Sequence, residues 1–466
     1  MFECNQEENL IRMVETLNDR SYQPATSVCF YVDRPKGREI FAADFADRII
    51  HHLIYNELAP VWEKIFIRQS FACRPEKGTH RAAKLLQIYL RKITKSGKIT
   101  AYYLKIDIQN FFMSINKLIL YQLLHKKCKN EDLRWLLKVV LFHDPTADYE
   151  LRSSKRIRQK IPQQKSLFYA MENCGLPIGN LTSQFFANVY LNSLDQFVKH
   201  ILKCRFYVRY VDDFILLSSD KNQLLMWQQQ ISQFLENELL LKLNPGATRI
   251  DSIFNGVDFV GFVIRPFYIL CRRRVLGNLK NKLKLFREML VQCDQVKTIY
   301  HYDHQVLEQL LATLNSYLGH FRHASMKKMI IKIFKNFSFL NQYFYLYFKR
   351  VTRKYKSPTD FYNLKHQVQY FSKIFSEHLL LFQVGCYYEA YSNAAKQLAS
   401  IMSYQVKRKW RGFNQACGFH QRLLERVYHK LDEQKVNYVI IKQTGKFLNQ
   451  IMERVPFLMV EFKKEV

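Results

Sequence analysis

Three features common in other classes of protein are missing from this sequence of 466 residues. Its ten cysteines stand singly, with no CxxC pair and no Cys/His grouping at zinc spacing, which argues against a disulfide framework or a zinc site. No apolar run reaches the roughly 18 residues of a membrane-spanning helix, and the N-terminal MFECNQEENL lacks the basic-then-apolar pattern of a signal peptide. We therefore expect a cytoplasmic protein with reduced cysteines and no membrane partner.

Acidic residues are also scarce, because 40 Asp and Glu face 71 Lys and Arg, which gives a net charge of +31. Such an excess suits a polyanionic partner, since Lys and Arg neutralise phosphates and release counterions. A surface charged only for solubility is the alternative, although a small domain needs a net charge of only about 2–8 for that. With 48% hydrophobic residues the chain can bury sizeable cores, and its length predicts roughly three packed units.

The residue patterns predict an α+β fold. Apolar positions at helical spacing predict a helix over residues 44–66, and residues 101–107 predict a short buried strand that ends in an acid. Residues 175–200 begin as a Gly/Pro loop and continue as a long amphipathic helix. Residues 207–219 predict two strands that meet at the Asp pair 212–213. We expect an antiparallel sheet backed by helices, with acids at the strand ends.

Cations cluster in three further segments. Residues 151–165, LRSSKRIRQKIPQQK, contain six cations and no acid, and residues 272–290 and 307–350 predict basic helices with interleaved aromatics. A solvated loop is one interpretation of the first segment, and a nucleic-acid contact is the other. Under the second interpretation the contacting residues would be Lys155, Arg156, Arg158 and Lys160.

The three acids at the predicted strand ends suit one chemistry. Nucleotidyl transfer uses two divalent metals about 3.5–4 Å apart, and Mg²⁺ prefers one or two carboxylates plus phosphate oxygens. A tight turn would place Asp212 and Asp213 at a strand tip, and a shared sheet would bring Asp107 beside them. An Asp-Asp pair alone is usually only a turn, so the prediction depends on Asp107 and on the Gly/Pro loop between them.

Several segments resemble motifs of reverse transcriptases. FYVRYVDDFILL is similar to their YxDD box, and YLKIDIQNFFMSI and GLPIGNLTSQFFANVYLN are similar to their first and second palm motifs. REIFAADFADRIIHHLIYN and FIRQSFACRPEKGTHRA resemble the fingers, and GVDFVGFVIRP resembles the primer grip. The resemblance covers about residues 30–350 and implies a right-hand polymerase, with fingers, palm and helical thumb, that copies RNA into DNA.

The resemblance implies a two-metal centre. Asp107, Asp212 and Asp213 would be the catalytic metal ligands, and Ile108 would supply a backbone carbonyl. The cofactor would be two Mg²⁺ ions, for which Mn²⁺ can substitute. The partners would be template RNA, the RNA–DNA hybrid, the primer and dNTPs, and an accessory protein or a second copy of the chain is a further candidate.

The resemblance also implies roles around the incoming nucleotide. Lys36 and Arg38 would grip the triphosphate, although either could be a plain surface cation. Phe112 would be the steric gate against a ribose 2′-hydroxyl, unless it is only a core residue. Arg74 would contact the templating strand or form a structural salt bridge. The other nucleotide-binding residues would lie beside the nascent base pair, and they are Ile178, Gly179 and Gln184.

The second palm motif narrows the resemblance. Most reverse transcriptases have Gln-Gly and Ser-Pro where this chain has Ile178-Gly179 and Ser183-Gln184. This form is similar to the enzymes of diversity-generating retroelements, which are found in bacteria, archaea and phages and misincorporate opposite template adenines. A reverse transcriptase of an antiphage defence system is the first alternative. A catalytically silent RNA-binding scaffold is the second, and the intact acids argue against it.

The C-terminal segment carries a second resemblance. LFQVGCYYEAYSNAAKQLASIM and GFHQRLLERVYHKLDEQKVNYVIIKQTG are similar to the mismatch-recognition domain of the MutS family. In that family an aromatic wedges beside a mispaired base and a Glu hydrogen-bonds it, and the matching positions are Tyr387 and Glu389. Tyr in place of Phe and Cys386 in place of Asp are departures, and ordinary aromatic packing is the alternative.

Together these patterns predict four parts of the chain. Fingers and palm would occupy residues 1–265 and a helical thumb residues 266–350. A linker would follow at residues 351–375, and a small α/β, MutS-like nucleic-acid-binding module would occupy residues 376–466.

Overall fold

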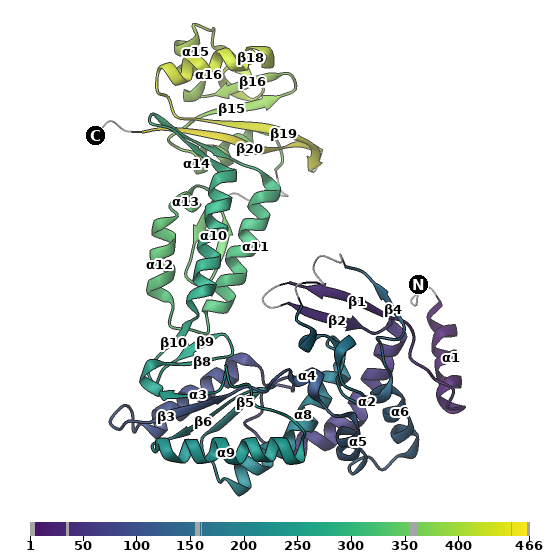
Figure 1. Cartoon of the computed structure of the whole chain (residues 1–466). Coiled ribbons are helices and arrows are strands. Elements are labelled where there is room, and N and C mark those ends of the chain that lie inside the picture. The colour runs from purple at the N-terminus through teal and green to yellow at the C-terminus, as the bar shows by residue number, and fades with distance from the viewer. Residues whose placement is uncertain are drawn as a thin grey trace. The chain divides into compact units, whose positions relative to one another are not determined.

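The structure is a computed structural model that describes residues 5–33, 37–153, 159, 161–354, 361–448 and 450–463. It divides the chain into two compact units, residues 1–270 and 271–466. Figure 1 labels their helices and strands. Within the described residues, no helix combines the length and the apolar character needed to cross a lipid bilayer.

The first unit is organised around a four-stranded sheet in the order β5-β6-β3-β7. All three pairings in this sheet are antiparallel, so the predicted antiparallel sheet is confirmed. Helix α9 packs against β3, β6 and β7, and helix α3 packs against β5 and β6. The strands are β3 (Tyr102–Ile106), β5 (Tyr207–Tyr210), β6 (Asp213–Ser218) and β7 (Arg249–Ser252), and the two helices are α3 (Thr79–Ile93) and α9 (Lys221–Glu238).

A helical layer forms the rest of the core of the first unit. Helix α8 packs against α2 and α5. Most of its residues are buried, including the polar Asn188 and Asp195, so the helix predicted here as amphipathic is in fact buried on nearly all sides. Asp44 caps α2 by accepting a hydrogen bond from the Ala46 amide. The helices of this unit outside the sheet are α1 (Gln6–Asn18), α2 (Phe45–Ile65), α4 (Phe111–Ser114), α5 (Lys117–His125), α6 (Glu131–Phe142) and α8 (Leu181–Gln196), which continues as the π-helical turn η4 (Phe197–Ile201).

Two small sheets complete the first unit. In the order β2-β1-β4, strand β1 pairs antiparallel with β2 and parallel with β4. The second small sheet has the order β10-β9-β8. The strands are β1 (Ser27–Val32), β2 (Arg38–Ala42), β4 (Tyr149–Leu151), β8 (Val257–Phe259), β9 (Phe262–Ile264) and β10 (Ile269–Cys271), and the 3₁₀ turns are η2 (Gln163–Lys165), η3 (Leu167–Tyr169) and η5 (Ile253–Asn255).

The second unit combines helices with one eight-stranded sheet in the order β11-β12-β20-β19-β15-β16-β18-β17. Strands β15 and β19 are parallel, and α15 packs against β15, β16 and β18. The helices are α10 (Arg273–Leu290), α11 (His304–Phe321), α12 (Lys327–Asn336), α13 (Leu340–Tyr343), α14 (Leu364–Ile374), α15 (Asn393–Met402) and α16 (Leu424–Glu433), with the 3₁₀ turn η6 (Gln421–Leu423). The sheet strands are β11 (Val291–Cys293), β12 (Lys297–His301), β15 (Leu379–Val384), β16 (Tyr387–Tyr391), β17 (Lys407–Trp410), β18 (Phe413–His420), β19 (Tyr438–Leu448) and β20 (Ile451–Phe462), and a separate pair is β13 (Phe344–Leu346) with β14 (Val351–Arg353).

The sheet of the second unit differs from the four-part division that the sequence predicts. Strands β11 and β12 lie in the predicted thumb, yet β12 pairs with β20 of the predicted C-terminal module. Residues 364–374, predicted as part of a linker, form helix α14, because Phe371 is buried and packs against Phe382 of β15. The boundaries at residues 265, 350 and 375 stay predictions.

Candidate active site

The Asp pair lies where the sequence predicts it, at the turn between β5 and β6. Tyr210 pairs with Asp213, so Val211 and Asp212 form a two-residue hairpin loop. Val211 has φ +54°, and positive φ at the first loop position is the pattern of a type II′ turn. A β-branched residue is strained in this region by on the order of 1–3 kcal/mol, so the turn needs support from its surroundings.

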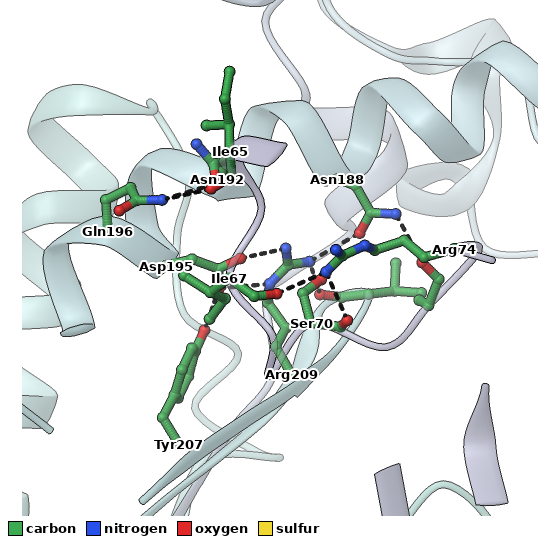
Figure 2. A network of polar contacts seen from close by, with 12 residues as sticks. Ile65, Ile67, Ser70, Arg74, Asn188, Asn192, Asp195, Gln196, Tyr207 and Arg209 are labelled. Carbon is green, nitrogen blue, oxygen red and sulfur yellow. Dashed lines mark hydrogen bonds and ion pairs between the residues drawn. The ribbon is translucent and has the colours of Figure 1, made fainter. Parts of the chain in front are cut away.

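A buried polar cluster beneath the turn supplies that support (Figure 2). The Arg209 guanidinium donates to both carboxylate oxygens of Asp195, at 2.8 and 2.6 Å, and neither side chain is exposed to solvent. Its Nη1 also donates to the Val211 carbonyl at 3.1 Å and to the Asn188 side chain at 3.2 Å. Asn188 in turn donates to the Ala72 carbonyl at 2.8 Å. Arg209 therefore ties the strained turn to α8 and, through Asn188, to the loop that precedes α3.

Asp107 follows β3 directly and is held by a segment distant in the sequence. Strand β3 pairs with β6 up to Ile106 and Phe214, which brings Asp107 beside the turn. The Asn244 side chain donates to Oδ2 of Asp107 at 2.8 Å, and its amide donates to the Asp107 carbonyl at 2.9 Å. The sequence did not single out Asn244. Asn244 lies in the segment LKLN, which forms a β-bridge from Leu243 to Ile108. This is a tertiary contact, and no local sequence pattern predicts it.

The electrostatics of the two adjacent acids differ. Burial and then the nearby Asp107 raise the pKa of Asp212 to about 6. Burial also raises the pKa of Asp213, but the ion pair of its Oδ2 with Lys105, at 3.0 Å, opposes that rise. Lys105 donates as well to the Asp258 carbonyl at 2.9 Å, which links Asp213 to the predicted primer grip. Asp107 and Asp212 thus form a site of concentrated negative charge, whereas Asp213 has a cation of its own.

A pocket of about 180 Å³ opens in front of Asp107 and Asp212. It gathers these two acids with three of the six nucleotide-binding residues that the sequence predicts, namely Arg38, Phe112 and Ile178. Phe112 is only partly buried and packs edge-on against Phe111 at 5.5 Å, so its ring borders the pocket as well as the core. The complete lining is Gly37, Arg38, Asp107, Ile108, Asn110, Phe111, Phe112, Met113, Lys165, Ile178, Asp212 and Asn244.

Lys165 is a pocket residue that the sequence analysis missed. It belongs to the basic segment 151–165, where nothing local separates it from its neighbours. The structure anchors the residues that follow it, because buried Glu39 of β2 accepts hydrogen bonds from the Ser166 hydroxyl at 2.9 Å and the Leu167 amide at 2.8 Å. This anchor places Lys165 in the pocket together with Arg38.

The Gly/Pro loop approaches β2 closely at the same pocket. The Phe41 amide donates to the Ile178 carbonyl at 2.9 Å. Gly179 has φ +135°, and a Cβ added there would lie 2.7 Å from the Phe41 carbonyl oxygen, so only glycine fits. Ile178, Gly179 and Gln184 line a second pocket of about 210 Å³ with Arg38 and Phe112. The predicted neighbours of the nascent base pair therefore do lie together.

The remaining predicted nucleic-acid residues are placed differently or not described. The Arg74 side chain is only 5% exposed and forms an ion pair with Glu63 at 2.7 Å. It also donates to the carbonyls of Ile67 and Ser70 (Figure 2). This arrangement favours the structural salt bridge over the contact with the templating strand, because most of the guanidinium donors are already used. Five predicted contacts lie outside the described residues, and they are Lys36, Lys155, Arg156, Arg158 and Lys160.

In the second unit, Tyr387 and Glu389 lie on β16 but differ in exposure. Tyr387 is 51% exposed and contacts His420 edge-on. Glu389 is buried and accepts a hydrogen bond from the Tyr391 hydroxyl at 2.6 Å and one from Nε1 of Trp410 at 3.4 Å. Arg411 lies 3.4 Å from the same carboxylate. In this conformation Glu389 is covered by the protein's own donors, in contrast to the predicted contact with a base.

The acids at the turn are the candidate metal ligands of the first unit. Among the described residues, no group of three or more His, Cys, Asp and Glu side chains is arranged as a metal site. Asp107, Asp212 and Ile108 do line the pocket together, and two carboxylates with a backbone carbonyl would fit Mg²⁺ completed by phosphate oxygens. Oδ1 of Asp213 is buried with no hydrogen-bond partner in the described structure, which is a further free oxygen beside the site.

Comparison with known proteins identifies the domain that carries this pocket. Residues 34–264 match the family model described as reverse transcriptase (RNA-dependent DNA polymerase). The chain is 22% identical over 275 residues to protein YkfC of Escherichia coli (strain K12), covering 52% of this chain and 67% of that protein. It is 21% identical over 325 residues to the group II intron-encoded protein LtrA of Lactococcus lactis subsp. cremoris, covering 56% of this chain and half of that protein.

Solved structures give a weaker likeness. Telomerase from Candida albicans, solved with a TWJ fragment of telomeric RNA, is 13% identical with a TM-score of 0.39 and covers 67% of this chain and 55% of that chain. Apo telomerase from Candida tropicalis is 14% identical with a TM-score of 0.40, covering 67% and 58%. Both scores lie below 0.5, so the match over residues 34–264, and not these structures, identifies the domain. Residues 34–264, just under half of the chain, thus match the reverse transcriptase (RNA-dependent DNA polymerase) domain.

Proposed function

We propose that this chain copies template RNA into DNA at the pocket of Asp107 and Asp212. The observation that carries the proposal is the composition of that pocket, whose lining combines two acids with the cations Arg38 and Lys165 and with Phe112. Acids that suit metal ions and cations that suit a triphosphate are the two charge requirements of nucleotidyl transfer. Its macromolecular partners are the template RNA, the primer and the RNA–DNA hybrid.

The residues that would hold two Mg²⁺ ions are Asp107, Asp212, Asp213 and the Ile108 carbonyl. When bound, the ions would activate the primer 3′ oxygen and hold the triphosphate, and Mn²⁺ can substitute for them. Burial and then repulsion from Asp107 raise the pKa of Asp212. A bound cation would relieve that repulsion, which supports cation binding here.

The chain's own residues position the substrates. Arg38 neutralises the triphosphate and can bind two of its oxygens at once, whereas Lys165 contributes a point charge. Phe112 fills the space that a ribose 2′-hydroxyl would need. Gly179 lets the backbone approach the new base pair, with Ile178 and Gln184 beside it.

A primer-extension assay tests this function. The full chain with an RNA template, an annealed DNA primer, dNTPs and Mg²⁺ is expected to extend the primer, and the isosteric Asp107→Asn variant is not. The two proteins should bind the template equally, because RNA affinity comes from the many cations. Extension by the variant, or none by the parent on any primed RNA, would contradict the proposal.

The narrower proposal is an error-prone enzyme of the diversity-generating retroelement type. Its support is Ile178, which lines both pockets and has no side-chain donor or acceptor for the nascent pair. A typical net hydrogen bond is worth about 0.5–1.5 kcal/mol, and about 1.4 kcal/mol corresponds to tenfold in selectivity. Sequenced cDNA should contain errors mainly at template adenines, and Ile178→Gln should reduce them up to about tenfold. Uniformly low errors in the parent would favour the antiphage-defence alternative.

For the second unit we propose a MutS-like nucleic-acid-binding role. The support is the exposed ring of Tyr387 on β16, since an apolar wedge has to reach the solvent before it can unstack a base pair. Glu389 would need to leave Tyr391, Trp410 and Arg411 before it could contact a base. Tyr387→Ala should therefore weaken binding to a mismatched duplex more than to a matched one, and equal losses would assign the ring to ordinary packing.

A further inference from the structure

An exposed basic hairpin lies at the edge of the eight-stranded sheet. We define the basic hairpin as residues 407–413, which are strand β17, its turn and the first residue of β18. Arg411 and Gly412 form the loop between Trp410 and Phe413 and both have positive φ, the pattern of a type I′ turn. All four residues of β17 and both loop residues are exposed.

The charge of the basic hairpin is of one sign. Its polar surface consists of Lys407, Arg408, Lys409 and Arg411, and residues 403–424 contain no acid. Charged residues on an edge strand also prevent sheet-to-sheet aggregation, so charge alone does not establish a binding role. Trp410 favours the binding role, because a large exposed aromatic side chain at a sheet edge would promote aggregation and not prevent it.

Trp410 is held among cations. Nζ of Lys407 lies 4.4 Å from its ring centroid and the Arg411 guanidinium 5.6 Å from it. Its indole nitrogen donates to Glu389, and Arg411 forms an ion pair with the same carboxylate. Single-strand binding proteins stack bases on open aromatic faces, and here cations lie over the ring instead. The hairpin therefore presents ammonium and guanidinium groups fixed around a rigid centre, which suits phosphates more than bases.

We propose that the basic hairpin binds the phosphate backbone of a nucleic-acid duplex without reading its sequence. A two-stranded ribbon fits the major groove of B-form DNA, which is about 12 Å wide. Glu389 orients the hairpin through Trp410 and Arg411 and thus acts as a positioning residue, not as a base contact. The inference rests on the proposed nucleic-acid role of the second unit, and it assigns the main contact to the basic hairpin and not to Tyr387.

The test compares two triple variants of the full chain. Lys407→Gln/Arg408→Gln/Lys409→Gln removes three hairpin cations, and Lys396→Gln/Arg422→Gln/Arg426→Gln removes three exposed cations near α15 and α16 as a matched control. Binding to a short blunt DNA duplex and to a single strand of equal length is measured by fluorescence anisotropy over a salt series. Each lost duplex contact reduces the log–log salt slope by about 0.9, so the hairpin variant should lose about 2–3 and the control none.

Three outcomes would overturn the proposal: an unchanged duplex slope, an equal change in the control, or a loss confined to the single strand. Vesicles with phosphatidylserine are included because an anionic membrane is the competing polyanion. A loss on vesicles without a loss on the duplex would assign the hairpin to membranes. Primer extension on RNA by the parent is scored separately, so a failure of the polymerase proposal leaves the duplex measurement interpretable.

Discussion

Two neighbouring regions of the first unit bury carboxylates and treat them in opposite ways. In the cluster beneath the turn, both oxygens of Asp195 accept hydrogen bonds from Arg209, and the Tyr207 hydroxyl donates to Oδ1 at 2.7 Å. In the pocket above it, Asp212 lies near another acid, and burial and Asp107 raise its pKa to about 6. The first region satisfies its charge within the protein, whereas the second holds charge that an external cation can neutralise.

This difference separates structural acids from functional ones more sharply than burial does. A buried carboxylate with its own guanidinium stabilises one conformation, and removing the partner leaves an uncompensated charge. Carboxylates gathered without that compensation are costly to the fold and are retained where a ligand binds. The following substitutions test the contrast.

The largest effect is expected for Asp212→Asn. It keeps the shape of the side chain but removes the charge that binds metal, and metal stabilisation of the transition state is worth several kcal/mol, so synthesis should fall on the order of 10³-fold or more. Template affinity measured by filter binding should stay near that of the parent. Asp220→Asn, at the N-cap of α9, is the matched control and should retain full activity. Measurable synthesis by Asp212→Asn would place the functional charge elsewhere.

Arg209→Met is expected to give the largest change in stability. It leaves Asp195 buried without a partner, which costs about 3–5 kcal/mol in the free energy of unfolding, measured by urea titration. Arg205→Met, at an exposed arginine near the start of β5, should cost far less. The double variant Arg209→Met/Asp195→Leu should recover much of the loss, because no buried charge remains unpaired. Equal stability of the single and double variants would show that the pair does not act as a unit.

Phe112→Ala is expected to relax selection against ribonucleotides. Discrimination by the shape of a pocket is worth about 1–3 kcal/mol, so the ratio of rNTP to dNTP incorporation should rise roughly 10–200-fold. Phe112→Tyr keeps the ring and should keep the parent ratio. Competition assays with labelled rNTP and dNTP measure it, and an unchanged ratio in Phe112→Ala would make the ring a core residue only.

Lys165→Gln is expected to have the smallest effect of the four. A hydrogen bond to a charged group contributes about 1.5–3 kcal/mol, and solvent screening at this exposed lysine favours the lower figure, so the KM for dNTPs should rise about tenfold. The maximal rate and the template affinity should change little, and Lys165→Arg should restore most of the KM. A loss of template affinity with an unchanged KM would instead assign Lys165 to the nucleic acid.

The sequence predicts the parts of the site that depend on local patterns. Short apolar runs locate β3, β5 and β6, and the Asp pair between two of these strands locates the turn. Lys165 and Asn244 could not be found in this way, because both are positioned by contacts between residues more than 120 positions apart in the sequence. Glu39 anchors the residues next to Lys165, and a β-bridge beside Asp107 positions Asn244. The same limit applies to Arg74, whose salt bridge to Glu63 depends on how its loop folds back on α2.

The sheet of the second unit shows the same limit at the level of the fold. Residue patterns suggest a break between a thumb and a C-terminal module, since linkers are polar and Pro358 lies between them. The pairing of β12 with β20 joins the two sides of that break. No local sequence pattern specifies which strand will pair with the free edge of another.

The pairing of β12 with β20 also determines when the sheet of the second unit can form during synthesis. Tyr300 pairs with Met459, so β12 leaves the ribosome long before its partner exists, on the order of ten seconds earlier at ordinary rates of synthesis. Its neighbour β11 covers one edge of β12 early, because the two form a local hairpin. The other edge stays open to pairing with foreign strands until β20 emerges, so the second unit acquires its complete sheet only after β20 has been synthesised.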